Sequence, residues 1–134
     1  MKSIFLAFLL FASNVSSQVV DCAAGSTVFK IESQGFEPQP PVPGKDVTLW
    51  IDFTVPQGTI VTGGTSKYSI TFNGIPFSPT IEDLCTQVTC PIKSQNLTST
   101  SQWPTGLSGK VISKIQWYDE NQTYLLCSQL TVKS

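Results

Sequence analysis

Asp46-Val47-Thr48-Leu49-Trp50-Ile51-Asp52-Phe53-Thr54-Val55 carries the clearest structural pattern in this chain of 134 residues. Leu49, Ile51, Phe53 and Val55 would share one face of a strand, and Thr48, Trp50, Asp52 and Thr54 would share the other. Successive side chains of a strand point to opposite sides of its sheet, so the pattern predicts a strand with one buried face. The turn residues Pro56-Gln57-Gly58 would end this strand.

The same period of two recurs along the rest of the chain. It predicts strands over residues 67–73, 109–118 and 123–132, a short strand over 28–31, an edge strand over 59–62 and an exposed strand over 95–102. The expected inward faces are Tyr68, Ile70 and Phe72, then Val111, Ser113, Ile115 and Trp117, and finally Tyr124, Leu126, Ser128, Leu130 and Val132. The turn sequence at 119–122 should join the last two strands as a hairpin. About seven short strands without a helical period predict an all-β sandwich.

A proline-rich segment interrupts this pattern, with four prolines within residues 38–43. Proline fixes its own backbone angle and donates no hydrogen bond, so this segment can be neither a helix nor a central strand. We expect an extended crossing loop that ends in a turn at Gly44. A flexible linker between domains is the weaker alternative, because the roughly twenty residues before it are too few for a separate domain.

The N-terminal segment has the features of a secretory signal. A lysine, an apolar run of nine residues at 4–12 and small residues before position 18 follow one another. The run is shorter than the roughly 20 apolar residues that a membrane-spanning helix needs. We therefore expect residues 1–17 to be a signal peptide and residues 18–134 to be one domain. Asn96 and Asn121 begin Asn-x-Thr sequons and are expected to carry glycans.

The charged residues argue against one class of partner. The chain has eight Lys and Arg residues, all of them lysine, against nine Asp and Glu residues. Without the predicted signal and its lysine, the balance is 7 − 9 = −2. A nucleic-acid-binding surface needs a basic patch, so we expect no nucleic-acid partner.

The usual residues and motifs of catalysis are also missing. The chain has no histidine, which is the commonest general base and a frequent metal ligand. It has no nucleophile elbow, P-loop or dinucleotide-binding motif. The carboxylates of a glycosidase must face each other across a cleft, so Glu82-Asp83 and Asp119-Glu120 are better explained as solvated turn charges. We therefore expect no enzyme activity, no cofactor and no metal.

The four cysteines, Cys22, Cys85, Cys90 and Cys127, are predicted to form disulfides. Three pairings are possible for four cysteines. Cys85 and Cys90 are close enough in sequence to form a local bridge, which leaves Cys22 with Cys127. A zinc site is the alternative, but the absence of histidine and the expected oxidising route both favour disulfides.

Two aromatic residues lie outside the predicted strands. Phe77 follows Ile75-Pro76, and Trp103 precedes Pro104, so both occupy irregular segments bounded by proline. An aromatic residue in such a segment is less needed for sheet packing and suits the rim of a binding cavity. An ordinary sandwich core is the simpler explanation for most other large apolar residues.

Several of these motifs, taken in order, resemble the ML (lipid-recognition) domain family, including its Niemann–Pick type C sterol carriers and phosphatidylglycerol/phosphatidylinositol transfer proteins. The resemblance extends over residues 21–132. The matching motifs are Val20-Asp21-Cys22, Pro43-Gly44, Gly74-Ile75-Pro76-Phe77, Asp83-Leu84-Cys85, Cys90-Pro91-Ile92, Trp117 with Asp119-Glu120-Asn121-Gln122, and Leu126-Cys127.

The resemblance implies an immunoglobulin-like β-sandwich of two antiparallel sheets, with an apolar cavity between them that takes up part of a single lipid. It also implies the disulfides Cys22–Cys127 and Cys85–Cys90. Phe77 matches a sterol-contacting phenylalanine of the family, and Trp103 matches an aromatic residue at the cavity mouth. The sterol carriers have a further disulfide near the proline-rich loop, and its absence here favours the phospholipid-transfer branch.

The resemblance and the strand faces together predict the ligand site. The expected lipid-binding residues are Phe53, Ile70, Phe72, Ile75, Phe77, Trp103 and Trp117. We expect a monomer, secreted or in the endosomal or lysosomal lumen, that carries one sterol or phospholipid and contacts membranes or another carrier transiently. The alternative is a non-enzymatic recognition or adhesion module with a filled core.

Overall fold

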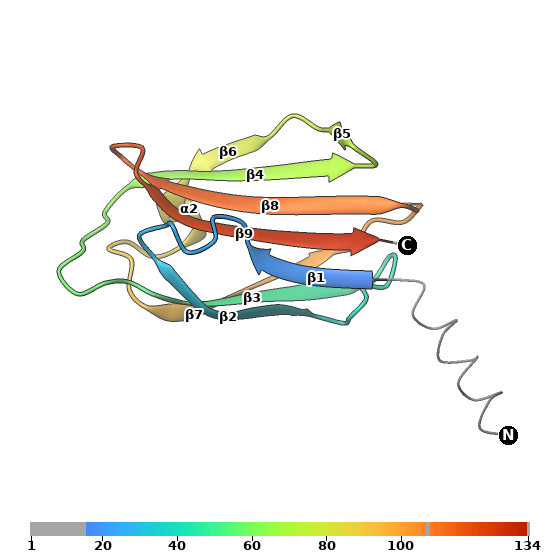
Figure 1. The fold of residues 1–134 in the computed structure, drawn as a ribbon, viewed down its shortest axis with the longest axis horizontal. Helices are drawn as coiled ribbons and strands as arrows, with labels where there is room; N and C mark the ends of the chain where they lie inside the picture. The colour runs from blue at the N-terminus through green and yellow to red at the C-terminus, as the bar shows by residue number, and fades with distance from the viewer. Residues whose placement is uncertain (1–15, 107, 134) are drawn as a thin grey trace, which may run out of the picture.

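The computed structural model describes residues 16–106 and 108–133, which form two facing antiparallel sheets (Figure 1). The larger sheet has the strand order β1-β9-β8-β4-β5, with β6 also paired to β4, and the smaller sheet has the order β2-β3-β7. The elements are β1 (Ser16–Asp21), β2 (Lys30–Glu37), β3 (Asp46–Thr54), β4 (Gly64–Phe72), β5 (Ile75–Pro76), β6 (Thr80–Asp83), α2 (Leu84–Gln87), β7 (Gln95–Gln102), β8 (Lys110–Asp119) and β9 (Tyr124–Lys133). The predicted all-β sandwich is confirmed.

The N-terminal part of the fold differs from the expectation. Most of the expected signal peptide, residues 1–17, lies outside the described residues, and Ser16 and Ser17 begin β1. β1 pairs with β9 at one edge of the larger sheet, a strand that the sequence pattern does not predict. The expected strand over 28–31 starts only at Lys30 and extends to Glu37. No helix in residues 16–106 or 108–133 is both long and apolar enough to cross a bilayer.

The smaller sheet has β3 at its centre, and β3 is the strand that the strict alternation from Asp46 onward predicts. Trp50 pairs with Gly35 of β2 on one side and with Thr98 of β7 on the other. The indole ring of Trp50 lies across Gly35, where it would overlap any added Cβ atom. The proline-rich segment connects the neighbouring strands β2 and β3 and turns at Gly44, so it is a loop within one sheet and does not cross between sheets.

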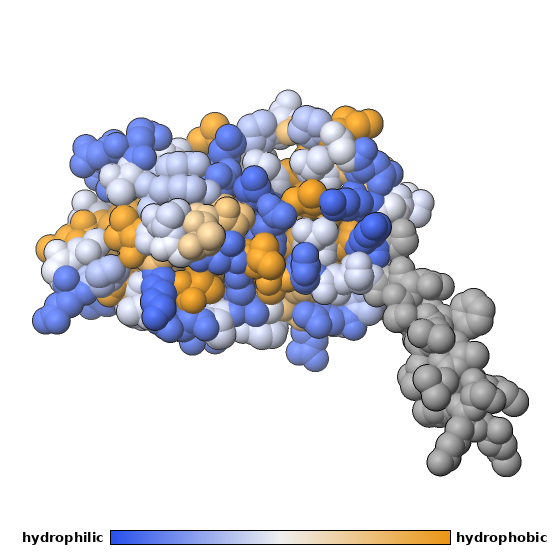
Figure 2. All heavy atoms as spheres, in the orientation of Figure 1, coloured by the Kyte–Doolittle hydropathy of each residue, from blue (hydrophilic) through white to orange (hydrophobic). Residues whose placement is uncertain are grey.

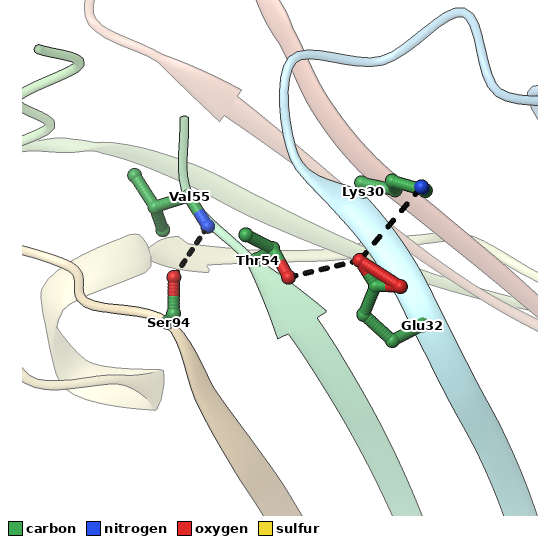
Figure 3. Close-up of polar contacts among 5 residues, drawn as sticks. All are labelled: Lys30, Glu32, Thr54, Val55 and Ser94. Carbon is green, nitrogen blue, oxygen red and sulfur yellow. Dashed lines mark hydrogen bonds and ion pairs between the residues drawn. The ribbon is translucent and has the colours of Figure 1, made fainter. Parts of the chain in front are cut away.

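Polar contacts align the strand ends at one end of the smaller sheet (Figure 3). Thr54 Oγ1 donates a hydrogen bond to Glu32 Oε1 at 3.0 Å, and Lys30 Nζ lies 4.0 Å from the same oxygen. The backbone N–H of Val55 donates to Ser94 Oγ at 2.7 Å. The Lys30 and Glu32 side chains are exposed, so their ion pair contributes little stability.

The predicted hairpin of the last two strands is confirmed, but it contains an irregularity. Trp117 pairs with Leu126, whereas Tyr118 pairs with Tyr124, which leaves Leu125 as an extra residue in β9. Tyr124 is therefore on the outer face, stacked on Tyr118 with ring centroids 5.0 Å apart. The expectation that Tyr124 shares the inner face with Leu126 is wrong, because this bulge reverses the alternation. Burial raises the pKa of Tyr118, and the adjacent Tyr124 hydroxyl adds to the rise.

The expected edge strand over residues 59–62 is a loop. Ile60 is exposed, whereas Val61 is buried in the core, and its carbonyl accepts a hydrogen bond from the backbone N–H of Ile92 at 3.1 Å. The partner of Val61 is thus an irregular segment and not a neighbouring strand. The apolar residues of segment 59–62 thus include one buried core residue, Val61, and do not form a strand.

Both expected disulfides are present. Cys22 and Cys127, with Cα atoms 5.2 Å apart, join the residue after β1 to β9. Cys85 and Cys90, with Cα atoms 5.5 Å apart, join α2 to the segment before β7. Asp83 caps α2, because its carboxylate accepts a hydrogen bond from the Cys85 N–H at 2.9 Å.

Gly64, at the start of β4, allows a close approach between β4 and β8. Its φ is 147°, and an added Cβ atom would overlap the carbonyl oxygen of Tyr118. Gly64→Ala is expected to lower the free energy of unfolding by about 2–4 kcal/mol, because backbone strain adds to an overlap with rigid backbone. Gly58 has a φ of 87° but open space around it, so Gly58→Ala should cost only about 1 kcal/mol. Equal midpoints for the two variants in urea unfolding would contradict this account.

Candidate functional site

A cavity of about 710 Å³ lies between the two sheets. The smaller sheet contributes Val47, Leu49 and Ile51 from β3 and Leu97, Ser99 and Ser101 from β7. The larger sheet contributes Ser66, Tyr68, Ile70 and Phe72 from β4, Val111, Ser113, Ile115 and Trp117 from β8, and Leu130 from β9. Apart from Thr98 of β7, which also lines the cavity, these residues alternate along their strands. The period of two that builds the sandwich thus also produces most of the cavity lining.

The cavity reaches the molecular surface along its rim. The rim residues are Phe77, Thr80, Glu82 and Gln87 on the segment from β5 to α2, and Gln102, Trp103 and Pro104 at the end of β7. Phe77 is 54% exposed and Tyr68 is 40% exposed, although both line the cavity. Figure 2 shows hydrophobic residues at the surface near β5, the strand that directly precedes Phe77 in the sequence. Part of the apolar lining is therefore accessible from solvent.

Backbone hydrogen bonds hold the two rim aromatics in position. The N–H of Phe77 donates to the Ile70 carbonyl at 2.9 Å, which ties the chain after β5 to β4. The N–H of Trp103 donates to the Lys45 carbonyl at 2.8 Å, and the Gly44 N–H donates to the Trp103 carbonyl at 2.9 Å. The turn that ends the proline-rich segment thus positions Trp103.

Five of the seven residues expected to bind lipid line this cavity: Ile70, Phe72, Phe77, Trp103 and Trp117. Ile70 and Phe72 come from β4, and Trp117 comes from the adjacent β8. Phe77 and Trp103 lie on the rim, in the proline-bounded segments where the sequence places them. Whether these side chains contact a ligand stays a prediction.

Phe53 and Ile75 are the two residues that do not line the cavity. Phe53 is 1% exposed, and its ring centroid lies 5.4 Å from that of Phe29 and 5.5 Å from that of Trp117. It therefore belongs to the solid core beyond Trp117. Ile75 is 64% exposed on β5, one strand beyond β4 at the edge of the larger sheet. The alternation along a strand could not show that Phe53 and Ile75 lie away from the cavity. It predicts which side of the sheet a residue is on, but not how far along or across the sheet it lies.

The prediction from the sequence did not include the part of the cavity wall that β7 forms. β7 is Thr- and Ser-rich, which indicates an exposed strand, and most of its residues are indeed exposed. Nevertheless Leu97, Ser99 and Ser101 line the cavity. The only sign of this wall in the sequence is that Leu97, Ser99 and Ser101 fall on the same face of the strand. Two of these three residues are polar, so the face does not look buried.

The cavity has little charge. Glu82 is the only carboxylate among the lining residues that the structure describes, and no lysine lines the cavity. The Gln87 side-chain amide donates a hydrogen bond to the Glu82 carboxylate at the rim. No group of three or more Cys, Asp or Glu side chains within the described part of the chain is placed to hold a metal ion.

The profile of the ML domain family matches residues 16–134. The chain belongs to the ML domain family. This is a non-catalytic family of lipid-binding proteins, in agreement with the expectation that the chain is not an enzyme. The motifs that carried the resemblance therefore identified the family correctly.

Two curated relatives come from Dictyostelium discoideum. "Putative phosphatidylglycerol/phosphatidylinositol transfer protein 1" is 35% identical over 83 residues, and the protein numbered 3 in the same series is 34% identical over 83 residues. Each match spans 60% of this chain and 54% of the relative. The chain thus aligns with about half the length of the curated relatives that it matches.

Solved structures of low sequence identity share the fold. A Niemann–Pick type C2 protein from the Japanese carpenter ant has a TM-score of 0.60 and 16% identity, over 85% of this chain and 96% of that chain. Chicken MD-1, solved in complex with lipid IVa, has a TM-score of 0.50 and 14% identity, over 91% of each chain. At these identities the likeness establishes the β-sandwich fold.

Proposed function

We propose that this protein binds a single sterol or phospholipid in the cavity between its sheets and transfers it between membranes or carriers. The observation that carries the proposal is the cavity of about 710 Å³, whose apolar interior meets solvent beside Phe77. The names of the Dictyostelium relatives support a phosphatidylglycerol- or phosphatidylinositol-like ligand. The lipid IVa complex of chicken MD-1 supports a lipid as the class of ligand.

The energetics of such a site need no catalytic group. Each methylene of a lipid chain gains roughly 0.8 kcal/mol when it leaves water for an apolar environment. Leu49, Ile51, Ile70, Ile115 and Trp117 would supply that environment. A polar headgroup left at the rim would keep its contact with water, which avoids the cost of burying it.

A recognition or adhesion module with a filled core is less well supported. Such a module would have side chains filling the space between its sheets. In the described part of this chain, that space contains a cavity. A partner protein that binds the lipid-loaded form remains compatible with the proposal, and co-purification of a protein without lipid would favour the adhesion alternative.

We also propose that the protein enters the secretory route and acts outside the cell or in the endosomal or lysosomal lumen. The disulfides Cys22–Cys127 and Cys85–Cys90 suit an oxidising compartment. Asn96 on β7 and Asn121 in the β8–β9 turn are both exposed, so glycans at these positions would meet no packed core.

Phe77→Asp tests the lipid-binding proposal, because it places a carboxylate on the apolar rim. Uptake of a fluorescent sterol and of fluorescent phosphatidylglycerol should weaken tenfold or more, since tenfold corresponds to only about 1.4 kcal/mol and desolvating a carboxylate costs more. The matched control is Ile75→Asp, which changes an exposed residue two positions away that does not line the cavity.

Ile75→Asp should retain uptake close to that of the wild type, and circular dichroism should show both variants folded. Trp103→Asp should also impair uptake, but Trp103 packs against the buried cluster around Phe36, so its stability must be measured alongside. A wild-type protein that takes up neither lipid class would refute the proposal.

A further inference from the structure

Hydroxyl groups line part of the cavity from both sheets. Tyr68 and Ser113 line it from the larger sheet, and Ser99 and Ser101 line it from β7. Leu97 is the only apolar member of the β7 lining, so this wall is mainly polar. Hydroxyls without any role in binding would lower the affinity for a purely hydrocarbon ligand, because they would lose hydration without gaining a partner.

Tyr68 and Ser113 form a defined pair. Their strands β4 and β8 are neighbours, with Ile70 opposite Ser113 and Tyr68 opposite Ile115. Ser113 Oγ donates a hydrogen bond to Tyr68 Oη at 3.0 Å. Two hydroxyl groups carry two hydrogens, and their mutual bond uses one of them, so the pair keeps one hydrogen with which to bind a third oxygen.

The charges around the pair indicate which kind of oxygen it suits. The described lining contains no lysine to neutralise a phosphate, and its single carboxylate, Glu82, already accepts a hydrogen bond from Gln87. Tyr68 is 40% exposed in the ligand-free protein, but a lipid that fills the cavity would cover it. A phosphate held there would lose hydration without meeting a cation, which is costly. A neutral oxygen needs only one donor and carries no such cost.

We infer that the Tyr68–Ser113 pair donates a hydrogen bond to a neutral oxygen in the buried part of the ligand, and that charged headgroups stay at the rim. The inference rests on the proposed lipid-binding function and narrows the ligand to lipids with such an oxygen next to the apolar part. An ester carbonyl of a glycerolipid and the hydroxyl of a sterol both meet this requirement. Tyr68 and Ser113 are then specificity-determining residues of the cavity.

Tyr68→Phe tests the inference, because it removes one oxygen and leaves the ring in place. Equilibrium binding would be measured with four probes: diester phosphatidylglycerol, its diether analogue without carbonyls, cholesterol, and cholestane without the hydroxyl. If the oxygen is an ester carbonyl, the variant should bind the diester lipid about three- to tenfold more weakly and the diether lipid as the wild type does. If it is a sterol hydroxyl, the same contrast should separate cholesterol from cholestane.

Ser113→Ala should reproduce the effect of Tyr68→Phe, since it removes the other half of the pair. Tyr118→Phe is the matched control, because it removes the same oxygen from a tyrosine on the outer face and should leave all four affinities unchanged. Urea unfolding of each variant would show that the fold persists. If Tyr68→Phe binds every probe that the wild type binds, and with the same affinity, this inference alone is overturned. Absence of binding by the wild type would instead refute the proposed function on which it rests.

Discussion

Replacing Cys22 and Cys127 together by alanine is expected to lower the free energy of unfolding by about 5 kcal/mol. This bridge joins residues 105 positions apart, so the chain-entropy model assigns it a large restriction of the unfolded state. Small domains are stable by only about 5–15 kcal/mol, so the variant should be close to unfolded at 37 °C. Guanidinium unfolding at 25 °C, followed by tryptophan fluorescence, would measure the change.

The second disulfide provides the control for this prediction. Cys85 and Cys90 are only 5 positions apart, and their double replacement by alanine should cost about 2 kcal/mol. Equal losses for the two double variants would contradict loop closure as the cause. They would instead point to local packing around the cysteines, of which Cys127 is the most buried.

Replacing Phe53 by alanine is expected to destabilise the protein by about 3–5 kcal/mol, as for other large core residues. The Phe53 ring stacks on Phe29 and meets Trp117 edge to face, so its removal leaves a void in the larger of the two buried core clusters. Urea unfolding of the ligand-free protein would measure the loss. Phe77→Ala, at the exposed rim, should cost less than about 1 kcal/mol.

The pair of variants also separates stability from binding. Phe77→Ala should weaken lipid uptake, whereas Phe53→Ala should retain it in the folded fraction, because Phe53 does not line the cavity. A Phe53→Ala protein of wild-type stability that has lost lipid uptake would show that Phe53 belongs to the site after all. That result would restore the interpretation based on strand faces alone.

The alternation of side chains predicted most strands well, for a physical reason. A strand with one buried face tends to place apolar residues at every second position. β3 has this pattern without interruption, and β4 and β8 have it apart from the inward-facing Ser66 and Ser113. The prediction was wrong where the backbone leaves regular pairing. Leu125 is an extra residue in β9, so Tyr124 lies on the outer face, and the buried Val61 lies in a loop.

The candidate site could be predicted only in part. Proline-bounded segments identified Phe77 and Trp103, and strand faces identified Ile70, Phe72 and Trp117. The same reasoning placed Phe53 and Ile75 in the site, because an inward face extends along the whole strand while the cavity occupies only part of the sandwich. The polar wall of β7 was missed, since hydroxyl side chains that line a cavity resemble those of an exposed strand in sequence.

The amino-acid sequence thus specified the sandwich, its main inward faces, the cysteine pairs and the ML domain family, because alternation, spacing and short motifs are local properties of the chain. Only the tertiary structure decided where the space between the sheets stays open. That depends on how residues from distant strands pack: Phe29, Phe53 and Trp117 fill one part of the sandwich, while Tyr68, Ser113 and Ser99 border the part that remains open. Packing density is a property of the assembled sheets, and no single strand carries it.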